Sequence, residues 1–480
     1  MEEKLVKEIP AKSENLSQWY IEVIRKAELA DYAPMKGMMV IRPAGYAIWE
    51  NIQRLLDKRF KETGHVNAYF PLFIPESFLK KEAEHVEGFA PEVAWVTRGG
   101  SEELQEPLAV RPTSEAIICA MYSKWVRSWR DLPLLINQWA NVVRWEKVTR
   151  PFLRTTEFLW QEGHTVHASF EDAQEEVLRI LGIYQDFIEK ELAIKVYAGR
   201  KSDREKFAGA LYTYTVEALM PDGKALQAGT SHNLGQNFSK AFEIRFEDRD
   251  QKLKYAWQTS WGVSTRLIGA TVMVHGDDDG LVLPPKVAPH QVVIVPIFKA
   301  RDKDKVLSVG EKLHADLKGR FRTVYDSREE YTPGWKFAEW ELRGVPLRIE
   351  IGPRDLEKNQ AVFVRRDTRE KFPVPLDEVV HRAEEVLEEI QRDLFKRSED
   401  FTRENTREAK DYEEFREILE ERRGFVVAPW CGREECELKV KEETKATIRL
   451  IPPEGESVEG KKCIVCGRPA KHVVYFARSY

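Results

Sequence analysis

Cysteine is scarce in this chain, and its apolar runs are short. Five cysteines occur in 480 residues, and four of them are clustered near the end. That number does not suit a disulfide-built scaffold, so we expect a protein of the reducing cytoplasm. Apolar runs such as VVIV at residues 292–295 are too short to span a membrane. The charged opening MEEKLVKEIPAKSEN also lacks the apolar core of a secretory signal.

A positive net charge, internal repeats and low-complexity tracts are absent as well. The net charge is −5, which argues against a protein that coats nucleic acid indiscriminately but allows a local basic groove. Hydrophobic residues make up 42% of the chain and charged residues 32%, as is typical of a globular protein. A chain of this length exceeds a single core, so two or three domains are expected.

The apolar pattern predicts three unlike parts. A helix is expected over residues 45–60, ending at Gly64, and closely spaced strands are expected at 211–219, 224–232, 242–248 and 270–276. Such spacing favours antiparallel pairing. A proline-rich joint at residues 280–298 leads into an α/β module of about a hundred residues. Residues 377–423 then carry dense charge around a helical apolar stripe, which indicates a solvated helix.

Residues 144–165, RWEKVTRPFLRTTEFLWQEGHT, mix arginine, glutamate and aromatic side chains to an unusual degree. Arg144 and Glu146 would share one face of a strand, and KVTRPF has the composition of a hairpin loop. On the return strand one face would carry alternate residues, namely Arg154, Thr156, Phe158, Trp160, Glu162 and His164. That face offers guanidinium groups for phosphate and a ring for stacking. A surface hairpin with ion pairs is the alternative.

Three shorter motifs have both a structural and a functional interpretation. RPTSE at residues 111–115 suits either a helix N-cap or a ligand site. Gly262 followed by Arg266 at the start of an apolar helix is a weak signal for a phosphate-binding turn. His232 is either structural or ligand-facing, and the glycines at 229 and 235 would let a ligand approach the backbone closely.

The clustered cysteines, CGREEC and CIVC, have the spacing of a tetrahedral Zn²⁺ site. The four ligands would be Cys431, Cys436, Cys463 and Cys466, with 26 residues between the two pairs. Two disulfides are the alternative. Cys119 lies among apolar residues and is interpreted as a buried small side chain.

Together, RPTSE, the 144–165 stretch, QAGTSHNLGQNFSK, TSWGVSTRLIGATVMVHGDDDGLVLPP and the cysteine motif resemble one family along essentially the whole chain. The chain resembles the class II aminoacyl-tRNA synthetases, specifically the prolyl-tRNA synthetases of the archaeal and eukaryotic type. The resemblance implies an α+β multidomain fold with three domains. These are an antiparallel-sheet catalytic domain at residues 1–285, an α/β anticodon-binding domain at 286–385 and a small α+β zinc-binding domain at 386–480.

The resemblance also implies roles for individual residues. Arg144 and Arg266 would be the catalytic residues, and Arg144 would contact both the α-phosphate of ATP and the carboxylate of proline. The other ATP-binding residues would be Glu146, Arg154, Phe158, Gln227 and Thr265. Proline would be bound by Arg144 together with Thr113, Glu115, Trp160, Glu162, His164, Phe207 and His232. Arg348, Glu350, Arg354 and Asp355 would read the anticodon, with ordinary ion pairing as the alternative.

Further expectations follow from the resemblance. ATP and L-proline would be substrates with Mg²⁺ bridging the phosphates, the zinc would be structural, and tRNA(Pro) would receive the prolyl group. The helix from Gly45 and the strand ending at Pro71 would form a homodimer interface. Only about a hundred residues separate the 144–165 stretch from Gly262, so no inserted editing domain is expected, and alanine or cysteine would be misactivated. A non-catalytic synthetase-like protein and a threonine enzyme are the rival interpretations.

Overall fold

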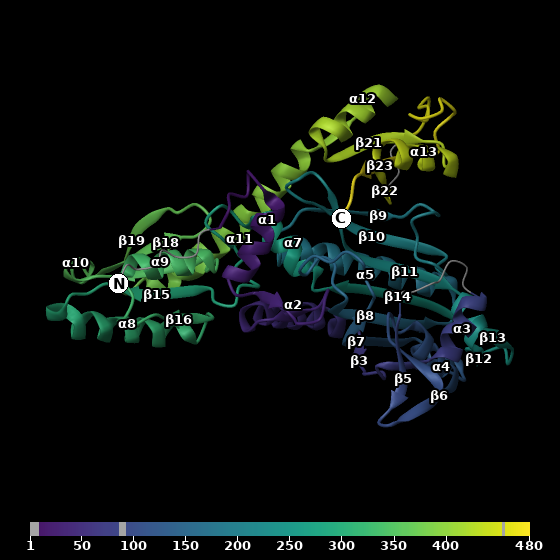
Figure 1. Cartoon of the computed structure of the whole chain (residues 1–480), viewed down its shortest axis with the longest axis horizontal. Coiled ribbons are helices and arrows are strands. Elements are labelled where there is room, and N and C mark those ends of the chain that lie inside the picture. Colours follow the sequence, from purple (N-terminus) through teal and green to yellow (C-terminus); the bar gives the residue numbers. More distant parts are fainter. Residues whose placement is uncertain (1–8, 86–92, 454–456) are drawn as a thin grey trace.

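The computed structural model describes residues 9–85, 93–453 and 457–480 (Figure 1). Its largest sheet has seven strands, and neighbouring strands are antiparallel except β3 and β7. In spatial order the strands are β3 (Val66–Asn67), β7 (Leu134–Val143), β8 (Glu157–His167), β14 (Trp257–Ser264), β11 (Ala225–Gly235), β10 (Tyr212–Leu219) and β9 (Val196–Arg200). The expected antiparallel pairing is therefore present.

Helices cover this sheet and build its main core. The long α5 (Phe170–Lys190) lies across β9, β10, β11, β14 and β8 (Figure 1). The predicted helix near Gly45 is α2 (Pro43–Glu62), which packs with α1 (Leu16–Lys26) and α7 (Arg266–His275). The helix α4 (Glu115–Trp125) belongs to a second cluster, with α3 (Glu76–His85) and α6 (Asn237–Phe242).

One expected strand is wrong. Residues 270–275 belong to the helix α7 and Gly276 caps it, although Thr271, Val272 and Val274 favour strands by local propensity. The helix is almost wholly buried, and a side chain at Gly269 would collide with Tyr20 and Leu153. Tertiary packing therefore overrides the local preference.

Smaller sheets border the main one. They are β1 (Ala30–Tyr32) with β2 (Met39–Ile41), the three strands β4 (Phe73–Pro75), β6 (Glu102–Val110) and β5 (Ala94–Gly99), and β12 (Arg245–Glu247) with β13 (Leu253–Tyr255). The expected strand at 242–248 is thus shortened to β12, because α6 extends to Phe242.

The α/β module has a mixed five-stranded sheet. Its order is β16 (Thr323–Tyr325), β15 (Val292–Pro296), β17 (Leu347–Ile351), β18 (Gln360–Arg365) and β19 (Lys371–Pro375). Alternate residues of β15 enter different clusters: Val292 and Ile294 pack with α8 (Lys303–Lys318), whereas Val293 and Val295 pack with α9 (Pro333–Leu342). Helices therefore cover both faces of this sheet, and the sequence predicted this module correctly.

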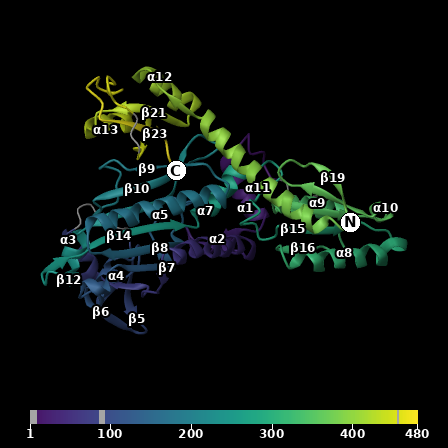
Figure 2. The same cartoon turned by 180° about the vertical axis from the view of Figure 1, so that it is seen from behind.

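The C-terminal part is reached through the long helix α11 (Val379–Glu404), which Figure 2 shows running between two sheets. A boundary at residue 385 falls within this helix. The C-terminal sheet has the order β20 (Thr406–Glu408), β21 (Phe425–Trp430), β23 (His472–Ala477) and β22 (Thr447–Leu450). It is accompanied by α12 (Tyr412–Glu417) and α13 (Glu434–Thr444). No helix in the described part of the chain has the length and apolarity that crossing a membrane requires.

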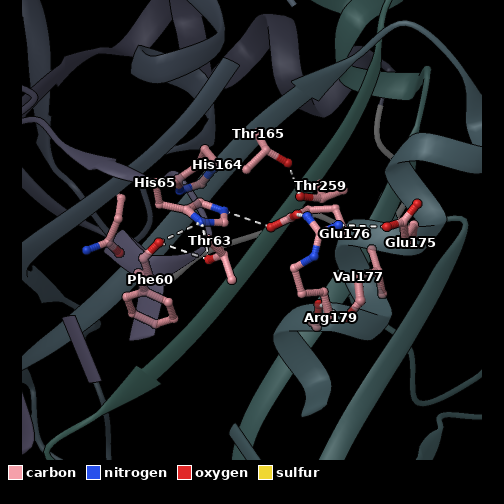
Figure 3. Close-up of polar contacts among 12 residues, drawn as sticks. Phe60, Thr63, His65, His164, Thr165, Glu175, Glu176, Val177, Arg179 and Thr259 are labelled. Carbon is pink, nitrogen blue, oxygen red and sulfur yellow. Dashed lines mark hydrogen bonds and ion pairs between the residues drawn. The ribbon is translucent and has the colours of Figure 1, made fainter. Parts of the chain in front are cut away.

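A buried polar cluster fastens α2 to α5 beneath the main sheet (Figure 3). His65, just beyond α2, shares a hydrogen bond of 2.7 Å with Glu176 of α5, and both side chains are buried. Arg179 donates to the second oxygen of Glu176 at 2.8 Å. On the adjoining strands, the hydroxyl groups of Thr165 and Thr259 bond to each other. Thr165 and Thr259 are the chain neighbours of His164 and Ser260, so their side chains point to the other face of the sheet. The cluster therefore supports the sheet from the face opposite to that of His164 and Ser260.

Candidate active site

A cavity of about 510 Å³ opens over the face of the main sheet that is turned away from α5. Its floor comes from β8, β14 and β11, and its sides come from residues 112–115, 144–146 and 205–207. Twelve of the residues predicted to bind ATP or proline line it: Thr113, Glu115, Arg144, Glu146, Phe158, Trp160, Glu162, His164, Phe207, Gln227, His232 and Arg266. Segments far apart in the sequence thus converge on one cavity.

Strand register explains how the floor is assembled. His164 on β8 lies opposite Ser260 on β14, which lies opposite His232 on β11, and His232 lies opposite Thr213 on β10. In the next row Glu162 lies opposite Gly262. Because a glycine there has no side chain, a ligand can approach the sheet closely at this row.

Two arginines line the cavity without an ion-paired carboxylate among the described residues: Arg144, which is exposed, and Arg266, which is half-buried. Arg144 donates from Nε to the carbonyl of Pro112 at 2.9 Å and stacks against Phe158 and Trp160. Arg266 donates from Nε to the carbonyl of Leu153 at 3.1 Å. Within the described residues neither guanidinium group forms an ion pair with a side chain. Both are therefore available to an anionic ligand.

The surrounding protein lowers the pKa of both arginines. Burial lowers the pKa of Arg144, although the charges of Glu115, Glu162 and Glu146 oppose this. Burial, together with the positive charges of Arg144 and Arg154, lowers the pKa of Arg266 to about 10. Arg266 therefore stays protonated at neutral pH, and an anion would relieve its repulsion from Arg144.

Glu162 occupies the other end of the cavity and is held by three donors. Its carboxyl group accepts hydrogen bonds from Ser114 Oγ, from Gln138 Nε2 at 2.8 Å and from His164 Nε2 at 2.9 Å. Burial alone would raise the pKa of Glu162, but these hydrogen bonds and the charge of His164 outweigh it and leave the pKa below its ordinary value. Glu162 is therefore an ionised, fixed carboxylate.

The RPTSE motif does begin a helix, but its serine does not cap it. Ser114 is the N-cap residue of α4, yet its side chain makes no capping bond and donates to Glu162 instead. Thr113 donates to Glu115, and both line the cavity. The ligand-site interpretation of this motif is thus favoured over simple capping.

His232 is buried and neutral at the same end. Burial, with a smaller effect of the nearby positive charge of His164, lowers the pKa of His232 to about 3. Its Nδ1 lies 2.9 Å from Thr213 Oγ1, and its ring lies against Phe207 with 4.8 Å between centroids. Phe207 and His232 therefore form one continuous wall.

Two predicted residues lie off the cavity wall. Arg154 is half-exposed, 3.9 Å from the carboxyl group of the wall residue Glu146, and Thr265 is buried at the start of α7. Arg144 and Glu146 follow the end of β7 rather than lying within a strand. The sequence reasoning missed Gln138, Ser260 and Thr230, for which only knowledge of the strand register could have given a signal.

The four terminal cysteines lie together. Their sulfur atoms lie within 4.8 Å of one another, and none is in a disulfide. Sγ of Cys431 is 3.6 Å from that of Cys436 and 3.8 Å from that of Cys466. Four thiolates at about 2.3 Å from a tetrahedral Zn²⁺ would lie about 3.8 Å apart, so this donor set fits that ion. The disulfide alternative, with sulfurs about 2 Å apart, does not fit.

The predicted anticodon residues differ in how far they are free to bind. Arg348 and Glu350 on β17 are buried and hydrogen-bonded to each other at 3.1 Å. Asp355 accepts from the backbone of Gly352 within α10 (Pro353–Glu357). Arg354 is exposed on this short helix. Ordinary ion pairing accounts for Arg348 and Glu350, whereas Arg354 remains open to a ligand.

Comparisons with known proteins assign the family. The family model described as tRNA synthetase class II core domain (G, H, P, S and T) matches residues 95–275. The anticodon binding domain matches residues 291–386, and the model of the prolyl-tRNA synthetase C-terminal region matches residues 412–480. The proline–tRNA ligase of Natranaerobius thermophilus is 62% identical over 480 residues, covering 100% of this chain and 99% of the relative. This chain belongs to the proline–tRNA ligase family.

Other relatives agree. The proline–tRNA ligase of Alkaliphilus oremlandii is 60% identical over 479 residues, 100% of this chain and 99% of the relative. That of Rubrobacter xylanophilus is 60% identical over 476 residues, 99% of both chains. The chain is thus an ATP-dependent class II proline–tRNA ligase with proline, ATP and tRNA(Pro) as substrates, and the rival interpretations are set aside. Residues 168–256 between β8 and β14 belong mainly to the catalytic sheet and its helices, consistent with a ligase without an inserted editing domain.

Proposed function

We propose that the cavity binds ATP at its arginine end and L-proline at its glutamate end. The observation that carries this proposal is the polarity of the cavity. Two guanidinium groups that form no ion pair with any described residue lie toward one end, and the fixed carboxylate of Glu162 lies toward the other. The α-phosphate and the carboxylate of proline would meet at Arg144, which would contact both. Phe158 would stack on adenine, and Glu146 would accept from its amino group.

The outer parts of ATP would be held by the remaining residues. Arg266 and Arg154 would bind phosphate oxygens, with Gln227 and Thr265 beside the nucleotide. At the other end, Thr113 and Glu115 would receive the secondary ammonium group of proline, which has two N–H donors. The pyrrolidine ring would lie among Trp160, Glu162, His164, Phe207 and His232.

The reaction needs positioning and charge stabilisation rather than a protein nucleophile. A carboxylate oxygen of proline attacks the α-phosphorus, the bond to the β-phosphate oxygen breaks, and pyrophosphate leaves with its electron pair. A ribose hydroxyl at the 3′ end of tRNA(Pro) then displaces AMP from the prolyl-adenylate. Arg144 and Arg266, as the catalytic residues, would stabilise the charge that develops on the phosphate oxygens.

Two kinds of metal ion would bind to the enzyme at different sites. Mg²⁺ would enter with ATP, since this ion binds phosphate oxygens, and would offset the negative charge of the phosphates. Zn²⁺ would be held by Cys431, Cys436, Cys463 and Cys466 and would stabilise the fold of the C-terminal part. Residues 1–285, 286–385 and 386–480 would act as catalytic, anticodon-binding and zinc-binding domains. Of the predicted anticodon residues, Arg354 is the one whose exposure supports a contact with tRNA(Pro).

The assembly would be a cytoplasmic homodimer, since tRNA is charged where proteins are synthesised. Several large apolar side chains are exposed on and near β1, β2, α2 and β3: Tyr32, Met35, Val40, Tyr46 and Val66, each between 41% and 60% exposed. Exposed apolar side chains near the elements expected to form the dimer interface support that assignment. Sedimentation equilibrium at micromolar concentration should give twice the chain mass, and Val66→Glu should give the single mass.

A kinetic split tests the two ends of the cavity. In proline-dependent ATP–pyrophosphate exchange, His232→Ala should raise the KM for proline and leave that for ATP near the wild-type value, because His232 would touch only proline. Arg266→Ala should do the reverse and also lower kcat. The exposed residues His381 and Arg301 provide matched controls, His381→Ala and Arg301→Ala. If His232→Ala and Arg266→Ala change both constants equally, the assignment of the two ends is wrong.

A further inference from the structure

The wall of the cavity beside Phe207 is a segment without regular secondary structure. It occupies residues 201–211, between β9 and β10, and its residues Glu205, Lys206 and Phe207 line the cavity. A segment that lacks the hydrogen bonds of a helix or a sheet must be held by side chains if it is to keep one conformation. Three side chains of this segment, those of Ser202, Arg204 and Glu205, contact the C-terminal helix α13.

Three residues on one face of α13 make these contacts. Glu434, Glu437 and Lys441 are spaced by three and four positions, so they lie on the same side of the helix. Ser202 Oγ donates to Glu437 Oε1 at 2.6 Å, and both side chains are buried. The other two contacts are ion pairs: Arg204 with Glu434 at 2.8 Å and Glu205 with Lys441 at 3.9 Å.

The strand β22 and the residue that follows it hold the start of the same segment. The backbones of Arg200 and Ile451 exchange two hydrogen bonds, at 2.8 and 2.7 Å, so the chain after β22 pairs with the end of β9. Arg449 of β22 and Lys201 both bond to the buried carboxyl group of Glu217 on β10. The C-terminal part of the chain therefore anchors the first half of the segment, up to Glu205.

The anchored segment fixes the position of Phe207 in the cavity wall. The backbone N–H of Phe207 donates to Thr213 Oγ1 at 2.9 Å, and the same hydroxyl group lies 2.9 Å from His232 Nδ1. A hydroxyl that accepts from one group and donates to the other fixes both at once. Displacement of residues 202–205 would therefore move Phe207 and take its ring away from His232. Arg144 and Arg266 stand on other elements.

We propose that α13 makes the C-terminal domain part of the amino-acid pocket, with Glu437 and Ser202 as positioning residues for Phe207 and His232. This inference rests on the assignment of that end of the cavity to proline. It gives the cysteine-rich domain a role in substrate binding, because α13 carries one of the four cysteines, Cys436, and begins three residues after another, Cys431.

The experiment is ATP–pyrophosphate exchange with the full-length zinc-loaded enzyme, in which KM is determined separately for proline and for ATP. Ser202→Ala and Glu437→Ala should each raise the KM for proline roughly three- to tenfold, the factor expected when one buried hydrogen bond is lost. The KM for ATP should change less than twofold. Glu437→Gln should recover most of the loss, because its amide oxygen can still accept from Ser202.

Two comparisons separate positioning from general damage. The double variant Ser202→Ala/Glu437→Ala should be no worse than either single variant, since both remove the same contact. Glu442→Gln, on the exposed side of α13, should match the wild type. Three results would each overturn the inference. They are equal increases in the KM values for proline and ATP in the single variants at Ser202 and Glu437, additive effects in the double variant, and a proline KM in either single variant within twofold of the wild type.

A charge exchange at the surface avoids any risk of misfolding. Arg204 and Glu434 are 30% and 66% exposed, so Arg204→Glu and Glu434→Arg should fold normally and raise the KM for proline about twofold. The combination of both should restore the wild-type value, and failure to restore it would contradict the inference. If His232→Ala itself leaves the proline KM unchanged, the assignment of the cavity end fails, and this inference fails with it.

Discussion

Ser114 allows a direct test of how the carboxyl group of Glu162 is held. The change Ser114→Ala removes one of the three donors to a buried carboxylate. Ser114 is itself fully buried, and alanine fits there because it is smaller than serine. A hydrogen bond to a charged group is worth about 1.5–3 kcal/mol, so kcat/KM for proline should fall on the order of ten- to a hundredfold. The same loss should lower the free energy of unfolding.

The sign of the pH effect follows from the hydrogen bonds. Donors to the ionised form hold the pKa of Glu162 down against burial, so removal of a donor raises it. The acid limb of the pH profile of kcat/KM should therefore move to higher pH. Ser123→Ala is the matched control, because Ser123 lies on the same helix and its hydroxyl group donates to the carbonyl of Ala120 at 2.9 Å, away from Glu162. An unchanged acid limb and an unchanged kcat/KM in a folded Ser114→Ala enzyme would refute the reasoning.

Three further predictions concern stability and metal binding. Burial lowers the pKa of His275 to about 4, so only the unfolded state takes up this proton between pH 6.5 and 4. The free energy of unfolding therefore falls as the pH falls through that range. In His275→Gln, urea titrations at several pH values should show a pH dependence of this free energy that is smaller by about one proton. A side chain at Gly163 would overlap the ring of Trp261, so Gly163→Ala should lose about 1–3 kcal/mol in denaturant unfolding, whereas Gly182→Ala, in open space within α5, should match or exceed wild-type stability. Purified enzyme should contain one zinc per chain by atomic emission; Cys463→Ser should lose it and melt at lower temperature, while Cys119→Ser should keep it.

The local alternation of residues 157–167 was predictable because a strand has a strict period of two. Phe158, Trp160, Glu162 and His164 were expected on one face, and all four line the cavity. The spacing of the terminal cysteines was equally informative, since metal geometry leaves few arrangements. The residues that support Glu162 were not predictable, because Gln138 and Ser114 reach it from another strand and a helix.

The one wrong element and the open alternatives have the same origin. Local composition favoured a strand at residues 270–276 and left the role of Ser114 open, because both depend on what packs against them. The helix α7 is set by its burial against α1 and α2, and the hydroxyl group of Ser114 by the charge of Glu162. Likewise, the sequence left open whether Arg348 and Glu350 read bases or form an ion pair, and the fold buries them against each other. Non-local contacts decide such positions.

The most direct test of the central claim is ATP–pyrophosphate exchange with each of the twenty amino acids, for the wild type and for Arg144→Ala. The account predicts exchange driven chiefly by proline, weak exchange with alanine or cysteine because one methylene is worth only about 1–3 kcal/mol, and loss of all of it in Arg144→Ala. Proline-dependent exchange that survives in Arg144→Ala would contradict the proposed site, and exchange driven chiefly by another amino acid would contradict the pocket.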